Sequence, residues 1–182
     1  IEAIGLDKTR TLTFGQPIVS DIIPLNGYSE QELLACSAGA ELFSEHPLAQ
    51  AIVDASRKKG YEPHAANGFK SVLGKGAQAK CLVCENEDIF IGKLDYIKEH
   101  QPIDHEAEKV VQRLSEEGKT SVVISFGKGV AGIIGLMDEV KPESLQAIAD
   151  LKALNIEPVM LTGDNNSAAK YVAERLGIKS FY

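Results

Sequence analysis

The stretch Ile4-Gly5-Leu6-Asp7-Lys8-Thr9-Arg10-Thr11-Leu12-Thr13 runs from an apolar segment directly into a carboxylate. Buried strands of a parallel sheet end in this way at the edge where α/β folds place their ligands. An aspartate at that edge can attack phosphorus and become an acyl phosphate. Lys8 can neutralise phosphate charge, and the threonine hydroxyls can donate hydrogen bonds. The stretch therefore predicts an α/β fold with Asp7 as its nucleophile.

Length and composition narrow the class of protein. The 182 residues allow one large or two small domains, and the net charge of -7 argues against nucleic acid as a partner. No apolar run approaches the roughly 18–20 residues of a transmembrane helix. The chain shows no signal sequence and begins within a strand pattern, so we expect a piece of a longer protein.

The middle of the chain changes character. Ser29 and Glu32 form a capping-box pattern for a helix that reaches about Leu42, and Pro47 opens a second helix that ends before Gly60. Short strand patterns follow at 69–73, 77–84 and 88–91, then an amphipathic helix at 104–116 and strands at 121–126 and 130–137. This order predicts an antiparallel α+β block.

The C-terminal part returns to an α/β pattern, with a helix at 143–154, a strand at 158–161 and a helix at 167–176. The simplest topology is one domain inserted into another. We expect residues 1–20 and 135–182 to form the first domain and residues 21–134 the inserted one.

The loop Thr162-Gly163-Asp164 follows the strand at 158–161 and points to the same sheet edge as Asp7. Thr162 and Gly163 can offer a hydroxyl and a backbone N–H to a phosphoryl group, and Asp164 can position its Mg²⁺ region or the nucleotide. The alternative for Asp164 is an ordinary helix cap.

Two motifs carry a resemblance to a known family. The stretch from Asp7 to Thr13 resembles the Asp-Lys-Thr-Gly-Thr-Leu-Thr phosphorylation motif of P-type ATPases, ion pumps of the haloacid-dehalogenase superfamily. Ser44-Glu45-His46-Pro47-Leu48 matches the Ser-Glu-His-Pro-Leu motif of the heavy-metal-transporting members. The resemblance implies a HAD-like, Rossmann-like phosphorylation domain, incomplete here, with an inserted α+β nucleotide-binding domain whose sheet is antiparallel.

The resemblance also implies the site residues and cofactors, which are ATP and Mg²⁺. The implied catalytic residues are Asp7, Lys8, Thr9, Thr162, Gly163 and Asp164, with Mg²⁺ at Asp7 and Thr9. The implied nucleotide-binding residues are Glu41, His46, Gly74, Gly76 and Lys93, although Lys93 stands where copper and zinc pumps carry Asn. For Gly74-Lys75-Gly76 a plain β-turn is the default alternative, and Asp138 fits the hinge where the inserted domain rejoins the first.

The expected function is the ATP-binding catalytic fragment of a heavy-metal pump, in which Asp7 takes the γ-phosphoryl group. Thr9 replaces the acid/base Asp of related phosphatases, which favours a persistent phosphoenzyme. We expect zinc or cadmium slightly over copper as the cargo, and a monomeric fragment that is itself soluble, on the cytoplasmic side of a membrane. Its partners would be the pump's membrane helices and actuator domain.

Arg10 departs from the family motif, which has Gly there. We expect its side chain to crowd the site and to lower phosphorylation. The family's downstream Gly-Asp-Gly-x-Asn-Asp segment, which carries much of the Mg²⁺ site, is also absent from the chain. Both departures support an alternative, a non-catalytic nucleotide-binding module with a regulatory or interaction role.

Three cysteines, Cys36, Cys81 and Cys84, fit a reducing compartment. In a straight strand, residues three apart point to opposite faces, so Cys81 and Cys84 would not meet one metal ion. With no second Cys/His pair nearby, we expect structural cysteines, and we expect His64, His100 and His105 on the surface.

Overall fold

The computed structural model describes residues 2–84, 87–127 and 129–182, and the chain divides into two compact units. The first unit comprises Ile1–Pro17, Ser115–Lys119 and Met137–Tyr182, and the second comprises Ile18–Leu114 and Thr120–Leu136. The two ends of the chain thus share the first unit, and the middle of the chain forms most of the second.

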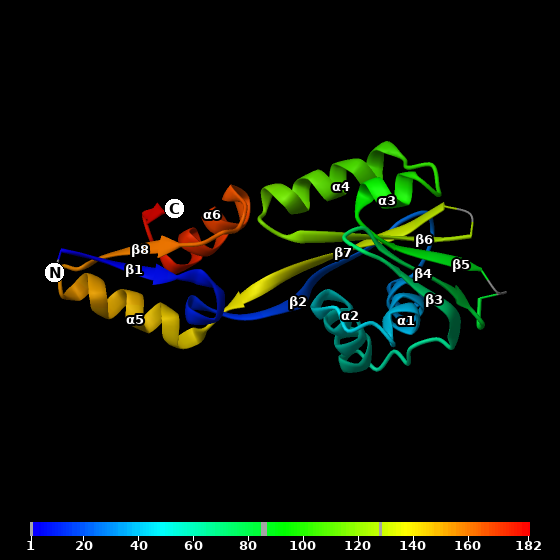
Figure 1. The fold of residues 1–182 in the computed structure, drawn as a ribbon, viewed down its shortest axis with the longest axis horizontal. Coiled ribbons are helices and arrows are strands. Elements are labelled where there is room, and N and C mark those ends of the chain that lie inside the picture. Colours follow the sequence, from blue (N-terminus) through cyan, green and yellow to red (C-terminus); the bar gives the residue numbers. More distant parts are fainter. Residues whose placement is uncertain (1, 85–86, 128) are drawn as a thin grey trace. The chain divides into compact units, whose positions relative to one another are not determined.

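The first unit contains a three-stranded parallel sheet in the order β1-β8-β9 (Figure 1). Its strands are β1 (Ala3–Asp7), β8 (Glu157–Leu161) and β9 (Ser180–Phe181), with helices α5 (Pro142–Ala153) and α6 (Asn166–Leu176). The apolar core joins Met160 of β8 to Ile148 of α5 and Val172 of α6. This arrangement is the α/β pattern that the chain ends predict.

The second sheet is antiparallel and has the order β2-β7-β6-β5-β4-β3. Its strands are β2 (Thr13–Pro24), β3 (Ala66–Val72), β4 (Gly76–Cys81), β5 (Asp88–Gly92), β6 (Thr120–Phe126) and β7 (Gly129–Val140). The long neighbouring strands β2 and β7 carry the chain between the two units.

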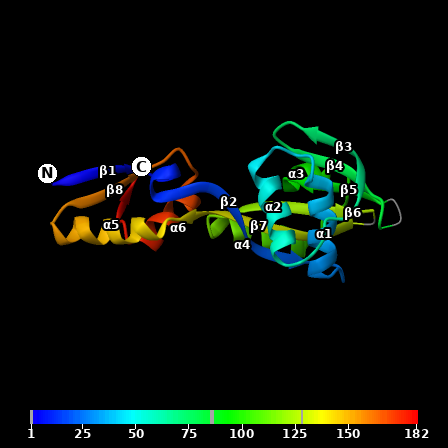
Figure 2. The ribbon, with the colours of Figure 1, turned by 90° about the horizontal axis from the view of Figure 1, so that it is seen from below.

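Helices cover both faces of this sheet in the second unit (Figure 2). Helices α1 (Glu30–Glu41) and α2 (Pro47–Lys58) lie on one face, and α3 (Leu94–Lys98) and α4 (His105–Glu116) lie on the other. Side chains alternate accordingly along β6, where Val122 and Ile124 join the α1/α2 core and Val123 joins the α3/α4 core. The sheet is therefore a shared wall between two apolar layers.

Local sequence signals explain where the first two helices begin. Ser29 and Glu32 make the expected reciprocal capping box at the start of α1, and Pro47 occupies the first turn of α2. The strand expected at 77–84 is wrong at its end, because β4 stops at Cys81 and the following three residues form a turn. Across the described residues, no helix combines the length and the apolar character needed to cross a bilayer.

Candidate functional site

Asp7 is the last residue of β1 and is exposed. It pairs in register with Leu161, the last residue of the parallel neighbour β8, and the loop Thr162-Gly163-Asp164 follows immediately. Because the carboxyl ends of adjacent parallel strands share one sheet edge, Asp7 and this loop lie at the same edge. The sequence predicts this juxtaposition, and the structure has it.

Lys8 links the two loops at this edge. Its side chain is only 6% exposed, and its ammonium group pairs with Asp164 Oδ2 and lies 3.8 Å from Asp138 Oδ2. A cation held by two carboxylates in a mostly buried position has little freedom to move. Lys8 is therefore a fixed positive charge next to Asp7 in the chain.

Asp138 near the end of β7 accepts three polar contacts. Thr13 Oγ1 donates to its Oδ2 at 2.5 Å, the Gly15 amide donates to its Oδ1 at 2.9 Å, and Lys8 lies beside it. These bonds tie β7 to the first residues of β2. These contacts make Asp138 a structural carboxylate, and its role at a hinge between the domains stays a prediction.

The helix-cap alternative for Asp164 is not what the structure shows. Asn165 is the N-cap of α6, and its Oδ1 accepts from the Ala168 amide at 2.9 Å. The Asp164 amide bonds Thr162 Oγ1 at 3.1 Å, and Gly163 would have no atom within 4 Å of an added Cβ. The Asp164 carboxylate is left to pair with Lys8.

Arg10 adopts a left-handed backbone conformation, with φ of 65°. Thr9 before it is extended and exposed, and the Arg10 carbonyl accepts from Lys141 Nζ at 2.7 Å. A Cβ on Gly15 would meet Arg10 Cγ at 2.4 Å, so the Arg10 stem lies over that glycine. A glycine would adopt this backbone conformation without strain, whereas a residue with a Cβ does not.

The residues at this edge fit Mg²⁺ in part. Mg²⁺ prefers oxygen ligands, and Asp7 and Asp164 supply carboxylates at the same sheet edge. The pairing of Asp164 with Lys8 leaves Asp7 as the carboxylate best suited to the ion.

The second unit contains a cavity of about 280 Å³ between the start of α2 and strands β3 to β6. It is lined by all five residues that the resemblance assigns to the nucleotide: Glu41, His46, Gly74, Gly76 and Lys93. Apolar side chains including Ile52, Val72 and Ile91 line the same cavity. An apolar cavity with a few polar groups is the usual form of a site for a planar base.

Glu41 is the buried acid of this cavity, with 8% exposure at the end of α1. Burial raises the pKa of its carboxyl above the ordinary value, and a hydrogen bond with Ser44 opposes that rise. A carboxyl group with restricted access to water gains from a hydrogen-bond donor on a ligand.

His46 is the N-cap of α2, directly before Pro47. Its Nδ1 accepts the Leu48 amide at 3.2 Å, which in the neutral ring places the proton on Nε2. His46 therefore offers a fixed ring orientation with an N–H donor on its outer side. The sequence predicts that His46 lies at the start of this helix, and the hydrogen bond from Leu48 identifies the tautomer of its ring.

The two glycines of Gly74-Lys75-Gly76 differ in their physical role. Gly74 has φ of 71° in open space, which fits the turn alternative, whereas a Cβ on Gly76 would lie 2.1 Å from the Ile91 carbonyl oxygen. Gly76 therefore allows β4 to approach β5, a reason unrelated to a ligand. Lys75 pairs with Glu99 at 2.7 Å, and Lys93 is exposed at the start of α3.

Sequence reasoning missed some of the polar lining. Ser44, Ser71, Thr120 and Ser121 also border the cavity. Ser44 belongs to the matched Ser44–Leu48 motif, so the sequence could have predicted it. The positions of the other three at the cavity depend on which strands become neighbours in the sheet.

The expectation that Cys81 and Cys84 point to opposite faces of a straight strand is wrong. Cys84 turns back toward Cys81, and both lie with Cys36 and His64 in one cluster of side chains whose ligand atoms are all within 4.8 Å of one another. His64 is half-buried in this cluster, while His100 and His105 are exposed as expected.

Comparison with known proteins gives a consistent result. The family described as a hydrolase, haloacid dehalogenase-like hydrolase, matches residues 1–182. "Copper-exporting P-type ATPase B" of Archaeoglobus fulgidus is 38% identical over the whole chain, which covers 25% of that protein, and "Copper-exporting P-type ATPase" of Bacillus subtilis is 35% identical over 98% of the chain, covering 22%. The chain therefore spans about a quarter of the length of these curated relatives.

A solved structure is similar across the full chain. The crystal structure of a zinc-transporting PIB-type ATPase in the E2.Pi state superposes with a TM-score of 0.89 and 34% identity, over all of this chain and 29% of that one. The expected lean toward zinc or cadmium is not supported, because the curated relatives named above are copper exporters.

Proposed function

Since the chain belongs to the haloacid dehalogenase-like hydrolase family, we propose that it is the ATP-binding catalytic region of a heavy-metal-exporting P-type ATPase. In this proposal Asp7 accepts the γ-phosphoryl group of ATP. The relatives named as copper exporters and the zinc-transporting structure support this class of pump. The proposal specifies the transported ion only as a heavy-metal cation.

One observation carries the proposal: Asp7 ends β1 in an exposed position beside the loop after β8, and Lys8 is held there by Asp164 and Asp138. A phosphoryl-transfer site needs a nucleophile, a positive charge and hydrogen-bond donors around the transferring group. Asp7, Lys8 and the Thr162 and Gly163 groups supply these at one sheet edge.

In the proposed reaction an Asp7 carboxylate oxygen attacks the γ-phosphorus, and the bond from that phosphorus to the bridging oxygen of ADP breaks. ADP leaves, and Asp7 carries an acyl phosphate. Mg²⁺, when bound, supplies charge neutralisation at the phosphate oxygens. Thr9 cannot act as a base at neutral pH, so water near the acyl phosphate is not activated by that residue.

The cavity of the second unit is the proposed adenosine site. The His46 Nε2–H and the buried Glu41 carboxyl would contact the base, and the apolar side chains would exclude water from its faces. Lys93 would add positive charge at the cavity border. We expect affinity for ATP in the range of roughly 0.1–1 mM.

Arg10 favours a second candidate function, a nucleotide-binding module that does not become phosphorylated. A large cation with strained backbone stands three residues after Asp7, where the family motif has Gly. In this alternative the cavity binds nucleotide, but Asp7 does not react.

Two measurements test the proposal. ATP titrated against the 182-residue chain should shift backbone amide resonances around His46 and Gly74, and His46→Ala should weaken binding about tenfold, which corresponds to 1.4 kcal/mol. His105→Ala, which changes an exposed histidine outside the cavity, is the matched control. Unchanged resonances around the cavity would refute the nucleotide site.

Phosphorylation separates the two candidate functions. The full-length protein that contains this chain should form an acid-stable, hydroxylamine-sensitive phosphoenzyme from ATP labelled in the γ-phosphate, and Asp7→Asn should abolish it. ATP binding without any phosphoenzyme would support the non-catalytic module. The pump's membrane helices and actuator domain are the proposed partners of the chain, and the chain itself would lie on the cytoplasmic side of the membrane.

A further inference from the structure

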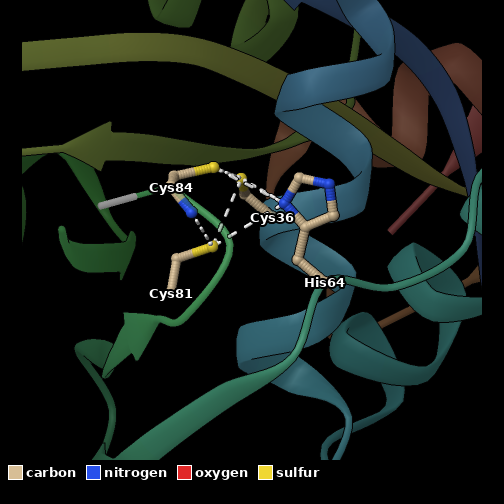
Figure 3. A group of neighbouring side chains, drawn as sticks. All are labelled: Cys36, His64, Cys81 and Cys84. Atoms are coloured by element: carbon tan, nitrogen blue, oxygen red, sulfur yellow. Dashed lines mark hydrogen bonds between the residues drawn. The ribbon is translucent and has the colours of Figure 1, made fainter. Parts of the chain in front are cut away.

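All three cysteines of the chain meet at one point in the second unit, together with one of its four histidines (Figure 3). Cys36 lies in α1, His64 in the segment between α2 and β3, Cys81 at the end of β4, and Cys84 in the turn that follows. Three separate stretches of chain, one of which carries both Cys81 and Cys84, thus direct a sulfur or a ring nitrogen toward a common centre. No part of the proposed phosphoryl transfer or nucleotide binding uses these residues.

Five of the distances between ligand atoms lie close to the edges of a tetrahedron around a zinc ion, and all the ligand atoms lie within 4.8 Å of one another. Zn–S bonds of about 2.3 Å and Zn–N bonds of about 2.0 Å give S···S edges of about 3.8 Å and S···N edges of about 3.5 Å. His64 Nδ1 lies 3.2, 3.7 and 3.5 Å from the sulfurs of Cys36, Cys81 and Cys84. The Cys36 sulfur lies 4.0 Å from that of Cys81 and 3.3 Å from that of Cys84.

Backbone hydrogen bonds and close packing hold the ligands in place. The Cys84 amide donates to Cys81 Sγ at 3.3 Å, which is an N–H···S bond that stabilises negative charge on a ligating sulfur. The His64 amide donates to the Ala35 carbonyl at 2.9 Å. A Cβ on Gly39 would lie 2.1 Å from the His64 carbonyl oxygen, so Gly39 allows the His64 segment to lie directly against α1.

Ordinary core packing explains the cluster less well. Cys36 and Cys81 are 1% and 0% exposed, yet their thiols face other sulfurs and a ring nitrogen. Thiols are weak hydrogen-bond donors, so contacts among three thiols and an imidazole contribute little to the stability of the fold. All three cysteines are free thiols. A disulfide between two of them would not explain why the third sulfur and the His64 ring lie at the same place.

We propose that Cys36, His64, Cys81 and Cys84 bind one zinc(II) ion in a closed tetrahedral site. The three thiol protons leave to solvent, and three thiolates and the neutral imidazole fill the coordination shell. With no open position, the ion is structural: it joins α1 to the β4 end of the sheet. The proposal is independent of the phosphoryl-transfer chemistry at Asp7.

Metal content and cobalt spectroscopy test the proposal on the tag-free, reduced 182-residue chain. We expect one zinc per chain by elemental analysis, and cobalt(II) in its place should give the visible and thiolate charge-transfer bands of a tetrahedral thiolate site. Zinc should also protect the thiols from a thiol-reactive dye. The wild-type chain alone decides this step, so it does not depend on a variant that folds.

Variants then locate the ion. Cys84→Ser and His64→Ala change the two half-buried ligands, and each should weaken zinc binding by roughly 100-fold or more in competition with a chromophoric chelator. His105→Ala should bind zinc as the wild type does. A folded, reduced wild-type chain that takes up no zinc, or a Cys84→Ser chain that binds it equally well, would overturn the proposal.

Discussion

The ammonium group of Lys8 pairs with the carboxylate of Asp164, which joins the segment after β1 to the loop after β8. The two residues are far apart in the sequence, and the pairing exists because β1 and β8 are parallel neighbours. It places a buried positive charge next to the candidate nucleophile Asp7. The electrostatics of this edge are therefore set before any phosphate arrives.

Replacing Lys8 by Met should destabilise the first unit by roughly 1–3 kcal/mol, because two carboxylates, Asp138 and Asp164, lose their shared cation. Phosphoenzyme formation should fall with it. Chemical unfolding followed by a probe in the first unit measures the stability change. The exposed Lys179→Met change is the matched control, and an equal effect from both would show that the Lys8 pairing is not special.

Replacing Arg10 by Gly should raise the free energy of unfolding by up to about 1 kcal/mol, because the left-handed φ of 65° no longer strains a side chain. It should also raise the phosphoenzyme yield in the full-length protein, if the guanidinium crowds the site as expected. Arg10→Ala separates the two causes, since it removes the guanidinium but keeps the backbone strain. Equal phosphoenzyme yields from Arg, Ala and Gly chains would eliminate crowding as an explanation.

Glu41→Gln should act in opposite directions on stability and binding. Burial raises the pKa of the Glu41 carboxyl above its ordinary value of 4.5, so the ionised form is disfavoured in the folded chain. The stability that this acid contributes is complete below its ordinary pKa and is lost as the pH rises through the raised value. The Gln variant should therefore be more stable than the wild type near pH 7, and the difference should vanish in acid.

The same Glu41→Gln change should weaken ATP binding, because a hydrogen-bonding carboxylate leaves the cavity. Unfolding curves across pH and an ATP titration check both effects. Glu45→Gln, at an exposed position nearby, should change neither. A stability difference for Glu41→Gln that is the same at every pH would contradict the role assigned to burial.

Gly76→Ala should destabilise the second unit by roughly 2–3 kcal/mol, because the new methyl group meets the Ile91 carbonyl oxygen between β4 and β5. Gly74→Ala should cost only about 1 kcal/mol, for its left-handed φ in open space. Thermal unfolding compares the two. If Gly74→Ala proves the more damaging, the close approach of the strands is not what requires glycine at 76.

Local patterns in the sequence predicted much of this fold. The Ser29–Glu32 capping box and Pro47 mark helix starts with side-chain chemistry that acts within a few residues. The strand that ends at Asp7 and the loop that ends at Asp164 follow from apolar periodicity and the edge rule of parallel sheets. These features depend on neighbours in the chain or on the general geometry of one sheet.

Other features depend on contacts that no local pattern encodes. The turn after Cys81 reverses the side chain of Cys84, and only the packing of α1 and the His64 segment brings Cys36 and His64 to the same place. The Cys-x-x-Cys spacing of Cys81 and Cys84 is typical of a metal site. The assumption that both lie in a straight strand led to the opposite prediction. Gly76 lines the cavity where the sequence places the nucleotide, but the need for glycine between β4 and β5 could not be predicted because it depends on β5 as the partner strand.

The division of the apolar side chains has a consequence for every stability measurement on this chain. Met160 and its neighbours form a core within the first unit, and the clusters around Ile124 and Val123 lie within the second. Calorimetry should then resolve two heat-absorption peaks, one for each unit. A substitution in one unit should shift only the peak of that unit, so a single melting temperature would not describe the unfolding of the chain.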